Sequence, residues 1–264
     1  MDALVFCSFG VADRMARERS LDSIARLLGE KFPDFAVFQA YTSAIIQKRL
    51  ARQNVNILSL PQILAKLYAD GYERVVIQPS HLTPGEEFNQ KIIQTAKEWQ
   101  EKFKALAVGE PVFAAPADYE QVLTAILPHF NTSDNEELVL IGHGSPHQHN
   151  PVYENLQQTA DYLNLKVTLG VLEASDTPNL AMVIDRLHSR QIKNILLAPL
   201  LLASGSHVSS DIFGSHENSW LTRLLKEGFK VRADKRGLGE LASFQNLYIA
   251  KAKAAIYEIT DRYK

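Results

Sequence analysis

The sequence predicts an α/β protein of two similar halves, each with a parallel sheet covered by helices on both faces. Short, continuous aliphatic runs alternate with amphipathic stretches along the 264 residues. Strands that are buried on both faces read as continuous apolar runs, because neither face meets water. The second half of the chain repeats the order of elements found in the first, which predicts a duplicated architecture.

In the first half, the aliphatic runs predict four strands and the stretches between them predict helices. The expected strands are residues 3–7, 35–40, 75–78 and 105–108. The expected helices are residues 14–32, 60–70 and 86–104, with another helix after the second strand. The helix over 60–70 is expected to stop at Gly71, since glycine is common just past a helix end.

In the second half, the same pattern predicts three strands and three helices. The expected strands are residues 138–141, 167–172 and 195–198. The expected helices are residues 150–163, 179–190 and 220–227. The polar stretch 131–137 is interpreted as the linker, so we expect an N-terminal half over residues 1–130 and a C-terminal half over 131–264 that carries the metal ligands.

The repeat can be followed residue by residue. Residues 63–87 align with residues 183–207 without a gap, and Pro79 falls on Pro199. Two similar α/β halves of this kind are Rossmann-like, and we expect their sheets to face each other across a cleft.

The same register makes the two halves chemically different at corresponding places. One alignment sets SFG against GHG, and so Phe9 against His143; the other sets Glu87 against His207. The first half has an apolar and an acidic residue where the second has imidazoles. We expect one rim to hold a metal ion and the other an organic ligand.

Composition and charge exclude several classes of function. The formal net charge of −2 gives no general attraction to nucleic acid or to anionic membrane. Cys7 is the only cysteine, so neither an intramolecular disulfide nor a cysteine-based zinc site is expected. The first apolar run is too short for a signal peptide or a membrane span. We expect a cytoplasmic protein without nucleic-acid or membrane partners, and a homo-oligomer stays possible.

Several catalytic motifs do not occur in the sequence. There is no Walker A sequence, no G-x-G-x-x-G after a strand and no G-x-S-x-G nucleophile elbow. We therefore expect neither a nucleotide nor a redox cofactor.

Three residues that can bind a metal follow predicted strands of the second half. His143 and Glu173 come directly after two of these strands, and His207 lies in the loop after a third. The carboxyl ends of parallel strands share one edge, where ligands bind. Two imidazoles and one carboxylate suit Co²⁺, Fe²⁺, Ni²⁺ or Zn²⁺. Each histidine alone is also compatible with an ordinary loop residue, whereas a carboxylate in the apolar context of Glu173 needs a partner or a metal.

Other polar residues also have two interpretations, which have similar weight for His81, Glu86 and Glu87, whereas solvation is favoured for His147 and His149. His81 and the pair Glu86 and Glu87 could line the cleft, deliver metal or contact substrate. Alternatively, the two glutamates begin a helix, whose dipole favours acids there. His147 and His149 could form a path for metal, or they are solvated loop residues.

The motifs together resemble a known family. They are SFG, AYTSAII and VVIQPSHLTPGEEF in the first half, and GHG, VLEAS, APLLLASGSHVSSDI and RGLGE in the second. Their order and spacing are similar to those of the sirohydrochlorin cobaltochelatases of anaerobic cobalamin biosynthesis, in the long form with two homologous halves. The resemblance extends over nearly the whole chain.

The resemblance implies a ferrochelatase-like fold of the chelatase superfamily, with a sirohydrochlorin-type tetrapyrrole held between the halves and Co²⁺ as the substrate metal. It implies that His143, Glu173 and His207 bind the metal and act in catalysis. We assign substrate binding to the matching rim of the first half, to Ser8, Phe9, Gly10, His81 and Glu87. Two alternatives stay open: an iron-inserting chelatase for sirohaem or haem, and a non-catalytic cleft protein that binds metal or tetrapyrrole.

Overall fold

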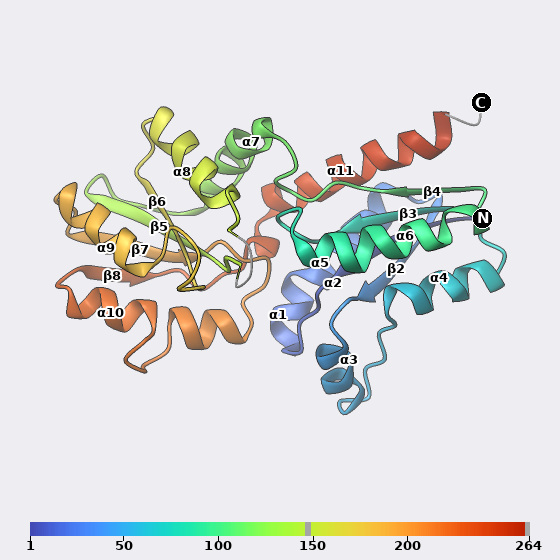
Figure 1. The fold of residues 1–264 in the computed structure, drawn as a ribbon, viewed down its shortest axis with the longest axis horizontal. Coiled ribbons are helices and arrows are strands. Elements are labelled where there is room, and N and C mark those ends of the chain that lie inside the picture. Colours follow the sequence, from blue (N-terminus) through green and yellow to red (C-terminus); the bar gives the residue numbers. More distant parts are fainter. Residues whose placement is uncertain (146–148, 262–264) are drawn as a thin grey trace. The chain divides into compact units, whose positions relative to one another are not determined.

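A computed structural model describes residues 1–145 and 149–261. The chain divides into two compact units, which are described separately (Figure 1). The first unit comprises residues 1–114 and the C-terminal segment from Ala242 onwards. The second unit comprises Ala115–Leu241.

The sheet of the first unit has four parallel strands in the order β2-β1-β3-β4. Each strand lies within two residues of its predicted position, because buried aliphatic runs leave little choice of register along the chain. Their bounds are β1 Asp2–Ser8, β2 Phe35–Tyr41, β3 Arg74–Pro79 and β4 Ala105–Val108.

The helices of the first unit cover both faces of this sheet. Helices α4 and α6 lie on one face, and α2 and α11 lie on the other (Figure 1). The bounds are α1 Arg14–Arg19, α2 Leu21–Lys31, α3 Ala44–Ala51, α4 Leu60–Ala69, α5 Glu86–Phe88, the π-helix η1 Asn89–Ile93, α6 Gln94–Trp99, the 3₁₀-helix η2 Gln100–Lys102 and α11 Ala242–Asp261. The helix predicted over 14–32 is broken at Ser20, whose hydroxyl donates to the carbonyl of Ala16.

Helix α11 belongs to the first unit, although its sequence follows the second. Tyr248 packs edge-on against Phe6 of β1, with ring centroids 5.7 Å apart, and donates its hydroxyl hydrogen to the carbonyl of Ser80 at 2.8 Å. The division therefore differs from the expected halves 1–130 and 131–264. The reason is tertiary: the apolar face of α11 is buried on β3, β4 and α2.

The second unit repeats the sheet, with four parallel strands in the order β6-β5-β7-β8. The bounds are β5 Glu136–Gly142, β6 Val167–Val171, β7 Asn194–Pro199 and β8 Lys230–Ala233. The sequence did not predict β8, because this short edge strand, KVRA, is largely exposed and carries no apolar run. The expected linker also differs, since its last two residues begin β5.

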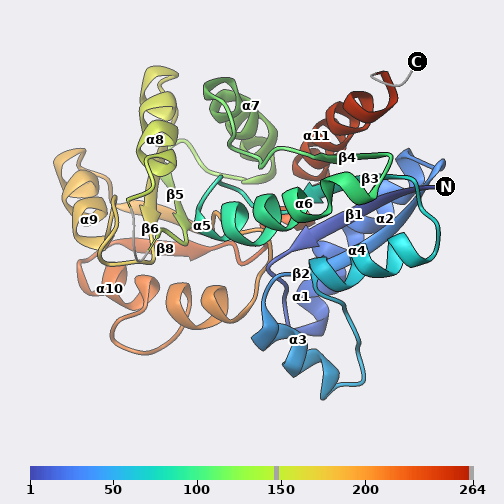
Figure 2. The same cartoon turned by 45° about the vertical axis from the view of Figure 1, so that its right-hand side comes forward.

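Helices again cover both faces of the sheet in the second unit. Helices α7 and α8 pack together on one face, and α9, η4 and α10 contribute to the core on the other (Figure 2). The bounds are α7 Pro116–Ile126, the 3₁₀-helix η3 Leu127–His129, α8 Val152–Tyr162, α9 Leu180–Ser189, the π-helix η4 His207–Ile212, α10 Trp220–Lys226 and the 3₁₀-helix η5 Leu238–Glu240. Helix α7 was not predicted, and its packing against α8 places residues 115–130 in this unit.

The two sheets have the same topology and the same register. Ser8 pairs with Tyr41 in the first sheet, as Gly142 pairs with Val171 in the second. The duplicated α/β architecture predicted from the sequence is confirmed. Whether a cleft separates the two sheets stays a prediction.

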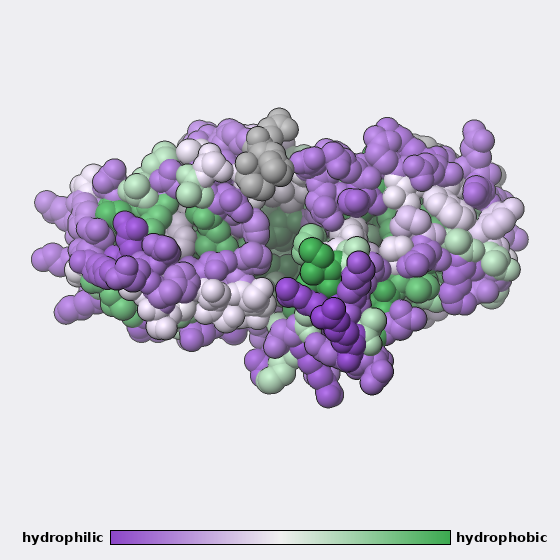
Figure 3. All heavy atoms as spheres, turned by 60° about the horizontal axis from the view of Figure 1, so that its bottom comes forward, coloured by the Kyte–Doolittle hydropathy of each residue, from purple (hydrophilic) through white to green (hydrophobic). Residues whose placement is uncertain are grey.

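Apolar side chains form the core of each unit, and polar residues cover most of the face shown in Figure 3. Among the described residues, none of the helices combines the length and apolarity needed to cross a bilayer.

Candidate functional site

The three residues predicted to bind metal lie together at the carboxyl edge of the second sheet. His143 Nδ1 is 4.0 Å from Glu173 Oε1. The rings of His143 and His207 meet edge to face, with centroids 4.8 Å apart. Strand β5 lies between β6 and β7 in the sheet, so the residues that follow these strands become neighbours. Their side chains are one third to about one half exposed, which leaves the group open to solvent.

The turn that carries His143 has little conformational freedom. A Cβ on Gly142 would lie 2.1 Å from the ring of Tyr153, so only glycine fits there. Gly144 has a φ of 78°, a left-handed conformation that glycine adopts without strain. The N–H of Glu173 donates to the carbonyl of His143 at 3.1 Å, which holds the two segments side by side.

His207 corrects one expectation, because it does not lie in a loop. It is the first residue of the π-helix η4, and its Nδ1 lies 2.7 Å from Asp211 Oδ2. A carboxylate in this position orients an imidazole and leaves Nε2 for a metal. Asp211 was not predicted from the sequence, although a spacing of four residues from His207 would bring the two side chains together on a helix.

His143, Glu173 and His207 lie close together, but in this structure they are too far apart to bind one metal ion at the same time. Two tetrahedral ligands with bonds near 2.1 Å would lie about 3.4 Å apart, whereas His143 and Glu173 are 4.0 Å apart. Among the residues that the structure describes, no three His, Cys, Asp or Glu side chains form a group that could hold a metal ion as they stand. The half-exposed side chains can close this gap by small rotations.

The corresponding positions of the first unit hold different chemistry. The N–H of Ser43 donates to the carbonyl of Phe9, as Glu173 does to His143, so Phe9 and Ser43 stand where the second unit has a histidine and a glutamate. Glu87 lies in α5 and stands where the second unit has His207. The structure keeps the backbone of the site in both units but the side chains predicted to bind metal in only one.

The residues expected to bind substrate differ in accessibility. Phe9 is 53% exposed, whereas Ser8 is 1% exposed and its hydroxyl has no hydrogen-bond partner among the described residues. A Cβ on Gly10 would lie 2.5 Å from the ring of Tyr41, so this residue shapes the turn. Only Phe9 among these three offers a side chain to a ligand.

His81 and Glu87 follow the third strand, β3. Both ring nitrogens of His81 are buried and have no hydrogen bond to any residue that the structure describes, and burial lowers the pKa of its imidazole to about 4. Burial, and secondarily the charge of Glu87, raises the pKa of the Cys7 thiol, which places Glu87 close to the end of β1. Glu86 and Glu87 do begin a helix, as the alternative interpretation expected.

A second group of ionisable residues lies next to the turn that carries His143 and consists of His149, Asp176 and Glu154. His149 lies between two carboxylates, with Nδ1 2.8 Å from Asp176 and Nε2 3.4 Å from Glu154. The hydrogen bond to Asp176, more than the charge of Glu154, raises the pKa of His149. Asp176 was not predicted from the sequence, and His147 lies outside the described residues.

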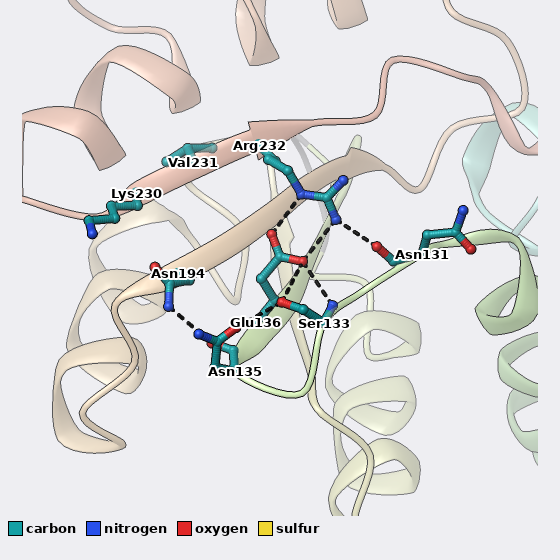
Figure 4. Close-up of a pocket in the computed structure, with 8 residues that line it drawn as sticks. All are labelled: Asn131, Ser133, Asn135, Glu136, Asn194, Lys230, Val231 and Arg232. Atoms are coloured by element: carbon teal, nitrogen blue, oxygen red, sulfur yellow. Dashed lines mark hydrogen bonds and ion pairs between the residues drawn. The ribbon is translucent and has the colours of Figure 1, made fainter.

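A surface pocket of about 500 Å³ in the second unit is not the site (Figure 4). It lies at the amino-terminal edge of the sheet, where β5, β7 and β8 begin. Its main charges are already paired: Arg232 Nε donates to Glu136 at 2.8 Å, and this interaction lowers the pKa of Glu136 to about 2.

Comparison with known proteins gives a family and a reaction. The family model described as cobalt chelatase (CbiK) matches residues 2–257. The sirohydrochlorin cobaltochelatase CbiKC of Nitratidesulfovibrio vulgaris is 28% identical over 98% of this chain and 92% of its own length. The sirohydrochlorin cobaltochelatase of Salmonella typhimurium is also 28% identical, over 96% of each chain.

Solved structures give the same fold. The sirohydrochlorin chelatase SirB from Bacillus subtilis subspecies spizizenii, determined in complex with cobalt, superimposes with a TM-score of 0.62. The match covers 97% of this chain and 96% of that one at 14% identity. The two parallel-sheet units described here therefore have the chelatase fold.

Proposed function

Because this chain belongs to the cobalt chelatase (CbiK) family, we propose that it inserts Co²⁺ into sirohydrochlorin during cobalamin biosynthesis. Both relatives named above act on this substrate according to their names. The observation that carries the proposal is the meeting of His143, Glu173 and His207 at one edge of the second sheet.

We assign the metal to these three side chains. Two neutral imidazoles and one carboxylate form a borderline-soft donor set suited to Co²⁺. Three protein ligands leave other coordination positions open for water and then for a ring nitrogen. The partial exposure of all three fits a site that must release its ion to the substrate.

The same residues account for the proton balance of insertion. A divalent ion enters the macrocycle as two pyrrole N–H protons leave it. An imidazole that has released the metal has a free lone pair that can accept a proton, so His143 or His207 takes one. Glu173 takes the other, and while the metal is bound its carboxylate reduces the net charge of the site.

In the first unit, Phe9 and Glu87 are the side chains that we assign to direct contact with the substrate. The exposed ring of Phe9 can stack on a flat macrocycle, and Glu87 supplies a negative charge. Ser8, Gly10 and His81 complete this rim through backbone contacts and shape, because their polar side-chain atoms are buried or missing.

The proposed reaction requires a divalent ion and a tetrapyrrole but neither a nucleotide nor a redox cofactor. We place it in the cytoplasm, and a homo-oligomer is compatible with it.

The test is an insertion assay. Purified protein is mixed with sirohydrochlorin and Co²⁺ or Fe²⁺, and metallation is followed by absorbance. We expect insertion of Co²⁺, and its loss in His143→Ala and His207→Ala while sirohydrochlorin binding, measured by fluorescence quenching, persists. His188→Ala is the matched control, since His188 lies on α9 and packs against Phe229. Normal insertion by both alanine variants at limiting Co²⁺ would show that the metal site is assigned wrongly, and preference for Fe²⁺ would change the metal.

A further inference from the structure

Asp176 is a buried acid that contacts both ends of the segment following His143. Its side chain is 0% exposed. The carboxylate accepts the N–H of Ser145 at 2.8 Å, before residues 146–148, and the N–H of Asn150 at 3.4 Å, after them. A third N–H, from Thr177, donates at 2.9 Å. One carboxylate thus fixes the backbone on each side of the segment.

His149 adds a fourth contact and joins a second carboxylate to the group. Its Nδ1 is 2.8 Å from Asp176, and its Nε2 faces Glu154 at 3.4 Å. The hydroxyl of Thr177 donates to Glu154 at 2.7 Å. Burial raises the pKa of Asp176, but its hydrogen bonds together lower the pKa by more than burial raises it. The pKa therefore lies below its ordinary value, and the group is an anion.

The turn of His143 lies directly against this anion. A Cβ on Gly144 would be 3.3 Å from Asp176 Oδ2, and the N–H of Gly144 donates to the hydroxyl of buried Tyr153 at 3.3 Å. The backbone from Gly144 to Ser145 is therefore held by Tyr153 on one side and Asp176 on the other.

The first unit shows that the fold does not need an acid at this position. Tyr41 and Val171 are equivalent in register, and five residues further along each chain segment lie Ile46 and Asp176. Ile46 packs on Gly10, with its Cγ2 3.0 Å from the place of a Cβ, as Asp176 packs on Gly144. The same turn is thus built over an aliphatic side chain in the unit that lacks the histidines.

We infer that Asp176 is a positioning residue of the metal site, which holds the turn so that His143 faces Glu173 and His207. Burying a carboxylate costs free energy unless it is hydrogen-bonded. Two of the hydrogen bonds that Asp176 accepts come from the backbone that follows His143, at Ser145 and Asn150. Groups that support a metal ligand through hydrogen bonds fix its orientation and thereby its affinity for the ion. The inference rests on the proposed function, because it takes His143 as a metal ligand.

The test compares two substitutions of Asp176. Asp176→Asn keeps the shape but replaces an acceptor oxygen by an NH₂ group, and Asp176→Ile introduces the residue of the first unit. Glu137→Gln is the matched control, since Glu137 is a buried acid of the same unit that accepts from Thr168 at 2.7 Å at the other end of the sheet. His143→Ala is the reference for loss of the site.

Two quantities are measured on protein whose folding is checked by circular dichroism. One is the binding of Co²⁺ alone, from its visible absorption, and the other is the pair of KM values for Co²⁺ and sirohydrochlorin. We expect Asp176→Asn to weaken Co²⁺ binding and raise the KM for Co²⁺ by about 10–100-fold, with the KM for sirohydrochlorin unchanged. Asp176→Ile should lose at least as much, and Glu137→Gln should melt at a lower temperature with an unchanged KM for Co²⁺.

The outcomes separate this inference from the proposed function. If His143→Ala loses Co²⁺ and folded Asp176→Asn binds it like the native protein, the positioning role is refuted and the metal site stands. An equal rise in the KM for Co²⁺ in Glu137→Gln would also refute it, because the effect would then reflect general destabilisation. If His143→Ala keeps Co²⁺, the metal site itself is wrong and the inference falls with it. Should Asp176→Ile not fold, Asp176→Asn decides alone.

Discussion

Replacing Gly144 by alanine tests whether the geometry of the turn that carries His143 controls the proposed metal site. The new Cβ would meet Val171 Cβ at 3.0 Å, Glu173 Cβ at 3.1 Å and Asp176 Oδ2 at 3.3 Å. Each contact is tighter than ordinary van der Waals packing, so neighbouring atoms must move by a few tenths of an ångström. One of those neighbours is a proposed metal ligand.

The size of the effect follows from two contributions. A non-glycine residue in the left-handed region costs about 1–2 kcal/mol, and overpacking a tightly packed position costs about 1–3 kcal/mol more. Gly144→Ala should therefore lower the free energy of unfolding by about 2–5 kcal/mol. Gly228→Ala is the control, because Gly228 lies in the same unit with a φ of 87° and nothing within 4 Å of its Cβ position. It should lose only the backbone contribution.

The assay is urea unfolding of both variants together with Co²⁺ titration. Because the new Cβ would displace Glu173, we expect Gly144→Ala to bind Co²⁺ at least tenfold more weakly, roughly the loss produced by removing a supporting contact. Gly228→Ala should bind Co²⁺ normally. If the two variants lose equal stability and keep equal Co²⁺ affinity, the turn does not constrain the site and the reasoning is wrong.

Three further predictions concern pH. Co²⁺ binding should weaken as the pH falls from about 8 to 5, because protons compete with the metal for imidazole; a flat titration would show that the histidines are not ligands. The pKa of His81 is lowered from 6.5 to about 4, so the folded protein favours the neutral imidazole and loses stability as the pH falls through this interval. His81→Leu should reduce that loss when unfolding is measured at pH 7 and pH 4. An unchanged pH dependence would argue against a buried imidazole. The pKa of Glu136 is lowered from 4.5 to about 2 by Arg232, so the ion pair stabilises the fold at neutral pH and this contribution is lost as the pH falls from 4.5 towards 2. Glu136→Gln should be less stable than the native protein at pH 7, and the difference should shrink in acid. Equal stability at pH 7 would refute a stabilising ion pair.

Much of the candidate site could be predicted from sequence, and the reason is local. Continuous apolar runs fix where parallel strands end, and the next residue then lies at the carboxyl edge of the sheet. His143 and Glu173 follow their strands directly, so their positions needed little tertiary information. His207 is further from its strand, and the helix it begins was not apparent in the small polar residues around it.

The partners of these residues could not be predicted in the same way. Asp176 and Ser145 are 31 residues apart, and their hydrogen bond depends on the register of β5 against β6. The sequence around Asp176 is compatible with an exposed turn, since aspartate is common there. Only the packed structure shows that its side chain is fully buried and bonded to the backbone beside His143.

The sequence by itself determined every described strand except β8, most helices, the duplication and the difference between the two strand-end rims, because periodicity and residue type act over a few neighbours. The tertiary structure alone decided that α11 belongs with the first sheet, where Tyr248 contacts Phe6. It also decided that Asp211 takes one ring nitrogen of His207, and that an acid in the second unit replaces the aliphatic Ile46 of the first. These features depend on contacts between side chains brought together by packing, and such contacts leave little pattern along the chain.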